Sequence, residues 1–305
     1  MKGIIERLII GGVTLVLIFF FYSGCKKSTS PTDNLDQEAI NRLISSDSYS
    51  FPQNIISSDS TSYPKLAVVD TIKFWWRKIN RVNRNIYANV YKADSTHLYP
   101  YAYATVIDTL YGQLFVLAEE SSQSMTKLIT DVAVKHAYFE EREGIETAYR
   151  GWRLIAVSGQ LIHSFPTDTR IIDSVKVVAP GKNLILTESD ITDTTSRGNI
   201  LTFTAGDSVT LTVFTRDLGD NTDSVFLHSL PCHYYNCKPH RRSFHDNGDG
   251  SFTGTWMVGN GMMDSVNVAI RHAAIDVIKH SSLDGTSSDP YDSRIWGFIY
   301  RVNAP

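Results

Sequence analysis

Strict alternation of apolar and polar residues is the feature that most constrains the fold of this chain. In the segment DSVTLTVFT, Val209, Leu211 and Val213 fall on one face of an extended strand. The large residues at alternate positions from Trp296 to Val302 do the same. Because successive side chains of a strand point to opposite faces, this pattern is typical of antiparallel strands with one buried face. The chain is therefore expected to be rich in β-structure.

The region before residue 166 combines one predicted helix with about five predicted strands. The helix covers LDQEAINRLI, with Asn34 as its N-cap and Gln37 completing a capping box. Residues 45–64 contain eight serines and two prolines and are expected to form a loop. From Leu66 to Ser158, segments rich in aromatic and β-branched residues alternate with polar or glycine-containing breaks, which predicts strands. We therefore expect an α+β region in which the helix packs on a curved antiparallel sheet.

Two hairpins carry resemblances to known folds. The segment AYFEERE, a short turn and YRGWRLIAVSG, with Trp152, resemble the closing hairpin of the cone-shaped nuclear-transport-factor-like superfamily. This resemblance implies an α+β domain over residues 34–165. The hairpin FHDNGDGSFTGTW, Phe244 to Trp256, resembles those of bacterial Ig-like and fibronectin-like surface modules. With about seven short strands at sandwich spacing, it implies an all-β, Ig-like sandwich over residues 166–305.

The N-terminus has the pattern of a secretory signal. Lys2 and Arg7 precede an uncharged, largely apolar run from Leu8 to Gly24, which is short for a membrane-spanning helix. The alternative is an uncleaved anchor helix. The residues YSGC, ending at Cys25, resemble the lipobox of bacterial lipoproteins. The resemblance implies a signal peptide over 1–24, a lipid on Cys25 and a tether over 25–33.

The residues after the cysteine and the overall charge bear on location and partners. Lys26 and Lys27 replace the aspartate that retains enterobacterial lipoproteins at the inner membrane, so the resemblance implies the bacterial outer membrane. The chain has 29 basic and 32 acidic side chains, a net charge of −3, which leaves no excess of cations to neutralise phosphates. Nucleic acid is therefore not an expected partner. The expected partner is the membrane, which the chain would contact through the lipid on Cys25.

The segment of residues 228–245 is the densest group of possible metal ligands. Zinc prefers thiolate and imidazole ligands, and the candidate set is Cys232, Cys237, His240 and His245. Because an exported protein meets an oxidising compartment, a disulfide between Cys232 and Cys237 is the favoured interpretation. Zinc binding and free thiols are the alternatives. The segment also contains His228 and His233.

The stretch DNGDG, residues 246–250, has two interpretations. It brings carboxylate and amide oxygens together, as a calcium loop does. It lacks the glutamate that closes an EF-hand, and Asn-Gly and Asp-Gly are typical of hairpin turns. Since strand-forming residues follow at once, a turn is predicted.

His136 is the one candidate acid or base in the N-terminal region. It falls on the alternating face that contains Leu128 and Tyr138, and a cone-shaped fold could place it in a cavity. Asp108 and Asp131 are the nearest carboxylates in the pattern. The alternative is a hydrogen-bonded core histidine.

These features predict a lipid-anchored envelope protein with a binding or structural role. The sequence contains no HExxH, GxSxG, Walker or GxGxxG motif, so no enzymatic activity and no cofactor are predicted. Beyond the membrane, the expected partner is an unidentified protein or glycan. The alternatives are a small-molecule hydrolase or isomerase that uses the cavity around His136, and a metal-binding lipoprotein that uses residues 228–245.

Overall fold

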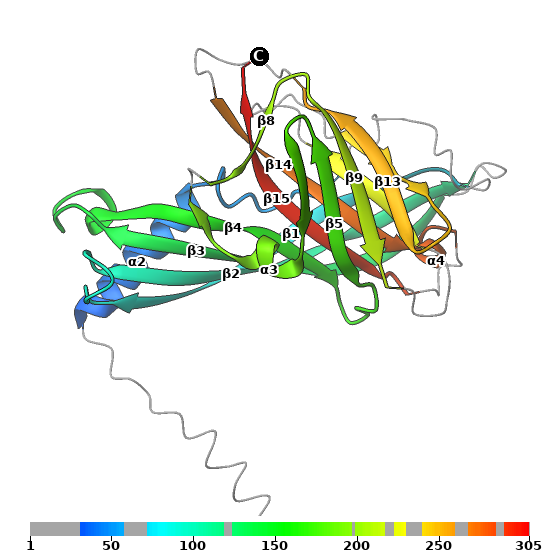
Figure 1. Ribbon diagram of the computed structural model, residues 1–305. Helices are drawn as coiled ribbons and strands as arrows, with labels where there is room; N and C mark the ends of the chain where they lie inside the picture. Colours follow the sequence, from blue (N-terminus) through cyan, green and yellow to red (C-terminus); the bar gives the residue numbers. More distant parts are fainter. Residues whose placement is uncertain are drawn as a thin grey trace, which may run out of the picture. The chain divides into compact units, whose positions relative to one another are not determined.

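The computed structural model describes residues 31–57, 72–118, 124–196, 199–216, 223–229, 240–259, 268–284 and 290–304 (Figure 1). The chain divides into two units, Met1–Asp36 and Gln37–Pro305, and the second contains both sheets. Helix α2 (Pro31–Ser46) crosses the division. Within the described part of the chain, every helix is too short or too polar to cross a membrane.

The fold is β-rich and contains two sheets. The larger has ten strands along the path β1 (Ile72–Tyr91), β2 (Tyr101–Ala118), β3 (Ser124–Glu141), β4 (Trp152–Ser164), β15 (Ser293–Asn303), β14 (Val268–Lys279), β10 (Asp223–Ser229) and β11 (His240–Ser243). Off this path, β7 (Thr195–Ser196) pairs with β4, and β8 (Leu201–Thr204) pairs with β15 in the parallel direction.

The smaller sheet has five antiparallel strands. Their order is β12 (His245–Asp246), β13 (Ser251–Met257), β9 (Ser208–Thr215), β5 (Ile172–Ala179) and β6 (Lys182–Leu186). Three short helical segments complete the described elements: a 3₁₀ helix η1 (Ala148–Gly151), α3 (Glu188–Thr192) and α4 (His280–Asp284).

The two regions distinguished in the sequence share the larger sheet. Strands β1 to β4 come from the first region and β15, β14, β10 and β11 from the second. The two sets join where Gln160 of β4 faces Gly297 of β15. The predicted boundary between residues 165 and 166 is therefore not an edge of the sheet.

The first four strands are long, and they replace the five expected ones. The segments predicted separately around Trp75 and Tyr87 are parts of one strand, β1, which pairs with β2 along its whole length. The connecting stretch alternates up to Ile79, with Arg77 buried and Lys78 exposed, and a register shift between Ile79 and Arg81 then moves the inward-facing positions by one residue. The charged residues between the two segments had predicted a break in the strand. The strand continues because the buried Arg77 is paired with the carboxylate of Asp276.

Helix α2 packs on the sheet from residue Gln37 onward. Ala39, Ile40 and Ile44 share a buried cluster with Ala104 of β2 and Phe139 of β3. The expectation that Asn34 is the N-cap is wrong, because the helix begins at Pro31. Proline suits the first helical position, because the N–H that it lacks would have no partner within the helix. Pro31 therefore indicates the start of the helix better than Asn34 does.

The smaller sheet faces the C-terminal strands of the larger one across an apolar core. In Figure 1, β5, β9 and β13 lie over β14 and β15. The alternating residues Val209, Leu211 and Val213 are buried in this core together with Trp296 and Tyr300, so the predicted alternation is confirmed.

The stretch of residues 246–250 forms the turn between β12 and β13. Gly248 and Gly250 have φ angles of 79° and 81°, which favour glycine. The Asp246 carboxylate accepts a hydrogen bond from the Gly248 N–H at 2.8 Å, and Asp249 accepts one from the Ser251 N–H at 3.0 Å. These carboxylates thus stabilise the turn.

Candidate functional site

The larger sheet divides into a fork between β4 and β15. The two strands pair only from His163 to Gln160 on β4. Beyond this point β4 pairs with β7 at Ala156 and Val157, and β15 pairs with β8 from Tyr300 onward. The fork opens towards the smaller sheet, whose last strand is β6.

Two glycines bring the strands together at the base of the fork. A Cβ on Gly159 would overlap the carbonyl oxygen of Gly297 and the side chain of Ile191. A Cβ on Gly297 would meet the end of the Ile55 side chain. Glycine is needed where two backbones approach this closely.

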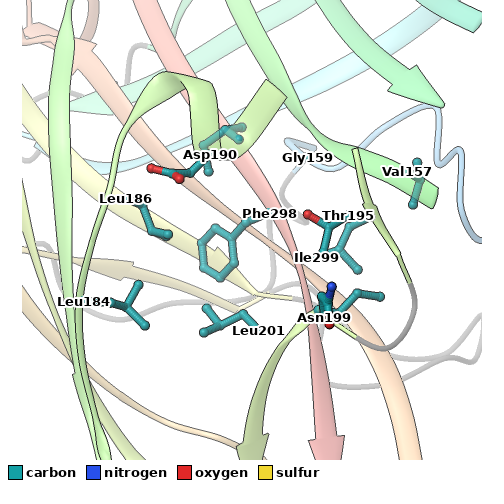
Figure 2. Close-up of a pocket in the computed structure, with 12 residues that line it drawn as sticks. Val157, Gly159, Leu184, Leu186, Asp190, Thr195, Asn199, Leu201, Phe298 and Ile299 are labelled. Carbon is teal, nitrogen blue, oxygen red and sulfur yellow. The ribbon is translucent and has the colours of Figure 1, made fainter. Parts of the chain in front are cut away.

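A cavity of about 280 Å³ occupies the fork, and we call it the fork pocket. Figure 2 shows the Leu184 and Leu186 side chains, which belong to β6, gathered with those of Leu201 and Phe298 around this cavity. The pocket is lined by Val157, Gly159, Leu184, Leu186, Asp190, Ile191, Thr195, Asn199, Ile200, Leu201, Phe298 and Ile299. A concave, mainly apolar pocket with a few polar groups is the usual form of a ligand site.

Three polar side chains border this apolar lining. Asp190 accepts hydrogen bonds from the Thr187 N–H and hydroxyl, both at 2.7 Å, and these bonds lower its pKa. It therefore remains a carboxylate at neutral pH. Within the part of the chain that the structure describes, the side chains of Thr195 and Asn199 make no hydrogen bond. They can bind a polar group of a ligand.

A second, smaller cavity of about 120 Å³ adjoins the fork pocket. The two share Val157, Ile200 and Ile299. Its far wall contains Tyr49 and His272, and the His272 Nε2 lies 2.9 Å from the Tyr49 carbonyl oxygen.

A different kind of site lies inside the larger sheet, which curls so that β1 meets β14. The Arg77 guanidinium on β1 binds both carboxylate oxygens of Asp276 on β14, with Nη2 to Oδ1 at 3.1 Å. Asp276 also accepts hydrogen bonds from His228 Nε2 and Ser293 Oγ, each at 2.9 Å. We call Arg77, His228, Asp276 and Ser293, with Asp131, the charged interior.

Burial and pairing set the charges of this group. Burial opposes ionisation of Asp276, yet Arg77 and the hydrogen bond from His228 hold its pKa well below the usual range. Burial lowers the pKa of His228, which is therefore neutral. With Nε2 donating to Asp276, the Nδ1 atom is left without a hydrogen bond.

Asp131 is the most strongly perturbed carboxyl of the charged interior. Burial, opposed by Arg77 and reinforced by Asp276, raises its pKa to about 7. Its Oδ2 accepts a hydrogen bond from the Tyr291 hydroxyl at 3.4 Å, and its Oδ1 has no partner. Such a group is a candidate acid or base, but it does not line any of the three pockets described in this section.

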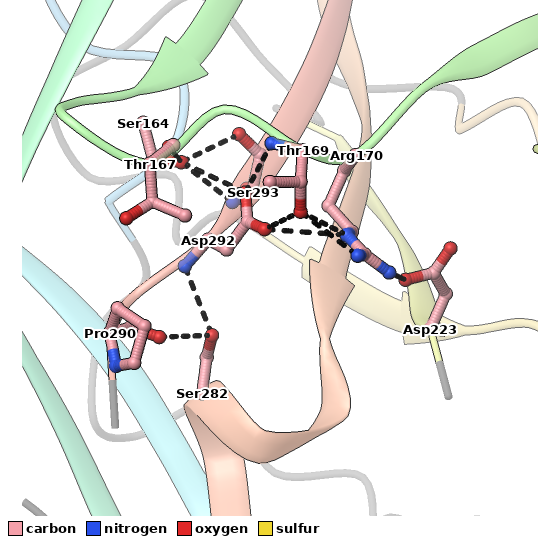
Figure 3. Close-up of polar contacts among 9 residues, drawn as sticks. All are labelled: Ser164, Thr167, Thr169, Arg170, Asp223, Ser282, Pro290, Asp292 and Ser293. Atoms are coloured by element: carbon pink, nitrogen blue, oxygen red, sulfur yellow. Dashed lines mark hydrogen bonds and ion pairs between the residues drawn. The ribbon is translucent and has the colours of Figure 1, made fainter. Parts of the chain in front are cut away.

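Ser293 connects the charged interior to a second polar network (Figure 3). The Ser293 N–H donates to Ser164 Oγ at 2.9 Å. The neighbouring Asp292 accepts hydrogen bonds from the Thr169 N–H and hydroxyl and lies 3.4 Å from Arg170, which also binds Asp223 at 2.8 Å. This network ties the chain between β4 and β5 to the start of β15.

A third cavity, of about 490 Å³, opens beside the 246–250 turn. Carboxylates of Asp173, Asp223, Asp246 and Asp249 border it, but Arg170 and Arg216 do as well. Arg216 binds Asp173, and Arg170 binds Asp223. Among the described residues, no three His, Cys, Asp or Glu side chains are grouped to hold a metal ion.

The structure separates His136 from the two carboxylates named with it in the sequence. His136 lies on the outer face of β3, with Nδ1 3.2 Å from Thr105 Oγ1. Asp108 and Asp131 are buried on the opposite face. Asp108 accepts hydrogen bonds from Arg84 at 2.6 and 2.7 Å. The three residues therefore do not meet in one cavity, and His136 lines none of the three pockets.

The predictions for the cysteines fall largely outside the described residues. Cys25, Cys232, His233 and Cys237 lie there, as does the side chain of His240. His245 is exposed in β12, and His228 is buried in the charged interior.

The fork pocket was not predicted from the sequence. Besides β4 and β15, its walls come from β6, α3, β7 and β8, which are short elements with little periodicity. One signal was present: Gly159 and Gly297 interrupt apolar strand patterns, and an isolated glycine in a strand marks a bulge or a close approach of backbones.

Comparison of the chain with protein-family models, curated protein sequences and solved structures finds no match in any of the three.

Proposed function

We propose that this protein is a lipid-anchored binding protein of the bacterial outer membrane that takes an apolar group of its ligand into the fork pocket. The observation that carries the binding role is the pocket itself, an apolar cavity of about 280 Å³ bordered by Asp190, Thr195 and Asn199. The anchoring rests on the N-terminal sequence that ends at Cys25. A binding role also agrees with the separation of His136 from Asp108 and Asp131.

We also propose that the two regions are related to the folds that their hairpins resemble. Packing of α2 on an antiparallel sheet supports a nuclear-transport-factor-like relation for residues 34–165. Two facing sheets with a common apolar core support an Ig-like relation for residues 166–305. Strands of both regions take part in the larger sheet.

The binding role is tested with N-phenyl-1-naphthylamine, a neutral apolar fluorophore that brightens in an apolar site. The purified protein is expected to bind it saturably with one site per chain. Leu184→Arg should weaken binding at least about tenfold, because a charge replaces an apolar wall of the pocket.

Ile185→Arg is the matched control. Ile185 is the next residue of the same strand, and its side chain is 61% exposed on the opposite face of β6. It should leave binding unchanged, and thermal unfolding of both variants separates a lost site from a lost fold. Absence of saturable binding, or equal effects of the two substitutions, would contradict the proposal.

Anchoring has its own test. Cys25→Ser should move the protein from the membrane fraction to the soluble fraction of the cell envelope and remove the acyl mass from its N-terminal peptide. Retention of the variant in the membrane through an uncleaved helix would contradict the lipid anchor.

A further inference from the structure

The free edge of strand β6 lies beside the fork pocket. Among the described residues, β6 pairs only with β5, through a two-residue turn at Pro180 and Gly181. Gly181 has a φ of 68°, as the second central residue of a type II turn requires. The other edge of β6 is the end of the smaller sheet.

The register of this hairpin assigns the main-chain groups of β6. Ala179 and Lys182 flank the turn and face each other, so they form the hydrogen-bonded pair that closes it. Alternate residues of a strand direct their N–H and C=O groups to opposite edges. Asn183 and Ile185 therefore direct theirs to the free edge, away from β5.

The same strand supplies side chains to the pocket. Leu184 and Leu186 line it, while the side chains of Asn183 and Ile185 are exposed. One ligand can thus meet two features together: regularly spaced main-chain donors and acceptors, and an apolar cavity directly beside them. A lipid or a small aromatic molecule fills the cavity but has no repeating groups for the edge. An extended polypeptide satisfies both.

We propose that the ligand of the fork pocket is an extended polypeptide segment, which adds to β6 as a new strand and places an apolar side chain in the pocket. This inference rests on the proposed binding function and names its ligand class. The Asp190 carboxylate at the α3 end of the pocket favours a basic residue at the corresponding end of the segment.

The probe is a short fluorescein-labelled peptide of alternating valine and threonine with a lysine at each end. Two N-methylated isomers accompany it, each methylated at every second residue but on opposite edges of the strand. Fluorescence anisotropy is expected to show saturable binding of the parent peptide. Because only one edge of an added strand pairs with β6, one isomer should lose binding and the other should keep it.

A protein variant tests the same hydrogen bonds from the other side. Ile185→Pro removes an edge-facing N–H and leaves the bonds to β5 in place, since proline is tolerated on edge strands. It should weaken peptide binding about tenfold, and Ile185→Ala, which keeps the N–H, should weaken it much less. Asn183→Pro removes the other N–H that faces the free edge. This second variant is used in place of Ile185→Pro if Ile185→Pro does not fold.

N-phenyl-1-naphthylamine separates the two proposals. If it binds but the peptide does not, or if both N-methylated isomers bind equally, the strand-addition inference is overturned and the apolar pocket remains. If neither the fluorophore nor the peptide binds, the proposed binding function is contradicted, and the strand-addition inference that rests on it is contradicted as well. Peptide binding that survives both proline substitutions would show that β6 is not its partner and would also overturn the inference.

Discussion

The charged interior and the fork pocket both contain residues of the larger sheet, but one is closed and charged and the other is open and apolar. The charged interior is closed, and its ionised groups, Arg77 and Asp276, are buried together with hydrogen bonds around them. The fork pocket is apolar and open, and the polar groups at its border are not committed to one another. Buried charges require paired partners, which makes such a site rigid and specific in its geometry. An open apolar cavity leaves its interactions to a ligand.

The largest effect is expected when one member of the charged interior is removed. Asp276→Ala leaves the Arg77 guanidinium buried without its carboxylate, which should lower the free energy of unfolding by about 3–5 kcal/mol. Chemical denaturation measures the change. Asp173→Ala breaks an exposed ion pair with Arg216 and should cost less than about 1 kcal/mol. Similar losses in the two variants would show that burial does not determine the cost.

Asp131 should make the stability of the charged interior depend on pH. Its pKa is about 7 in the folded protein and 3.8 in an unfolded chain, so between these values the folded state holds a proton that the unfolded state has lost. The contribution of Asp131 to the free energy of unfolding therefore falls as pH rises from about 4 to about 7 and is constant above and below this range.

Asp131→Asn removes this contribution. The variant should gain stability over the wild type progressively from pH 4 to 7, to a few kcal/mol in order of magnitude. Denaturation curves at several pH values measure the difference, in which the contributions of other groups cancel. A difference that does not change with pH would contradict the raised pKa.

The base of the fork should tolerate its two glycines differently. Gly159→Ala places a Cβ against the backbone oxygen of Gly297, and forcing these strands apart should cost about 1–3 kcal/mol. Gly297→Ala meets mainly the flexible end of Ile55 and should cost less. Thermal unfolding ranks the two. Equal costs would mean that the fork is not held by close approach of the two backbones.

A small change is also expected when the charged interior is made apolar. Replacing the pair together, Arg77→Met with Asp276→Leu, removes both charges and should leave the free energy of unfolding within about 2 kcal/mol of the wild type. A loss as large as that of Asp276→Ala would show that the pair itself, and not the penalty of an unpaired charge, stabilises the sheet.

Local sequence patterns predicted the strands but not how they assemble. The alternation around Leu211 and in the last strand follows from the period of a strand, which is local. Pairing of Gln160 with Gly297 joins residues far apart in the sequence, so the shared sheet was not predictable from segments considered separately. The same holds for Arg77, because its burial depends on the carboxylate of Asp276, which follows it in the sequence by 199 residues.

The candidate sites differ in the same way. The DNGDG turn was predicted because its residues are neighbours in sequence. The fork pocket combines β4 and β15 with the short elements β6, α3, β7 and β8, and the local signal of the close approach of β4 and β15 was their two glycines, Gly159 and Gly297. Alternation correctly grouped His136 with Leu128 and Tyr138, but the prediction that this face lines a cavity or the core was wrong, because it is the outer face and Leu128 is 82% exposed. Alternation along one strand also gives no information on which face Asp108 of another strand occupies.

The most direct test of the central claim is photolabelling of the pocket. A neutral aliphatic probe with a diazirine group is irradiated with the purified protein, and mass spectrometry identifies the labelled residues. Labels are expected within residues 184–201 and on Phe298 or Ile299, and both excess N-phenyl-1-naphthylamine and Leu184→Arg should suppress them. Labels confined to exposed apolar residues elsewhere, such as Leu98 and Leu128, and insensitive to competitor would contradict it.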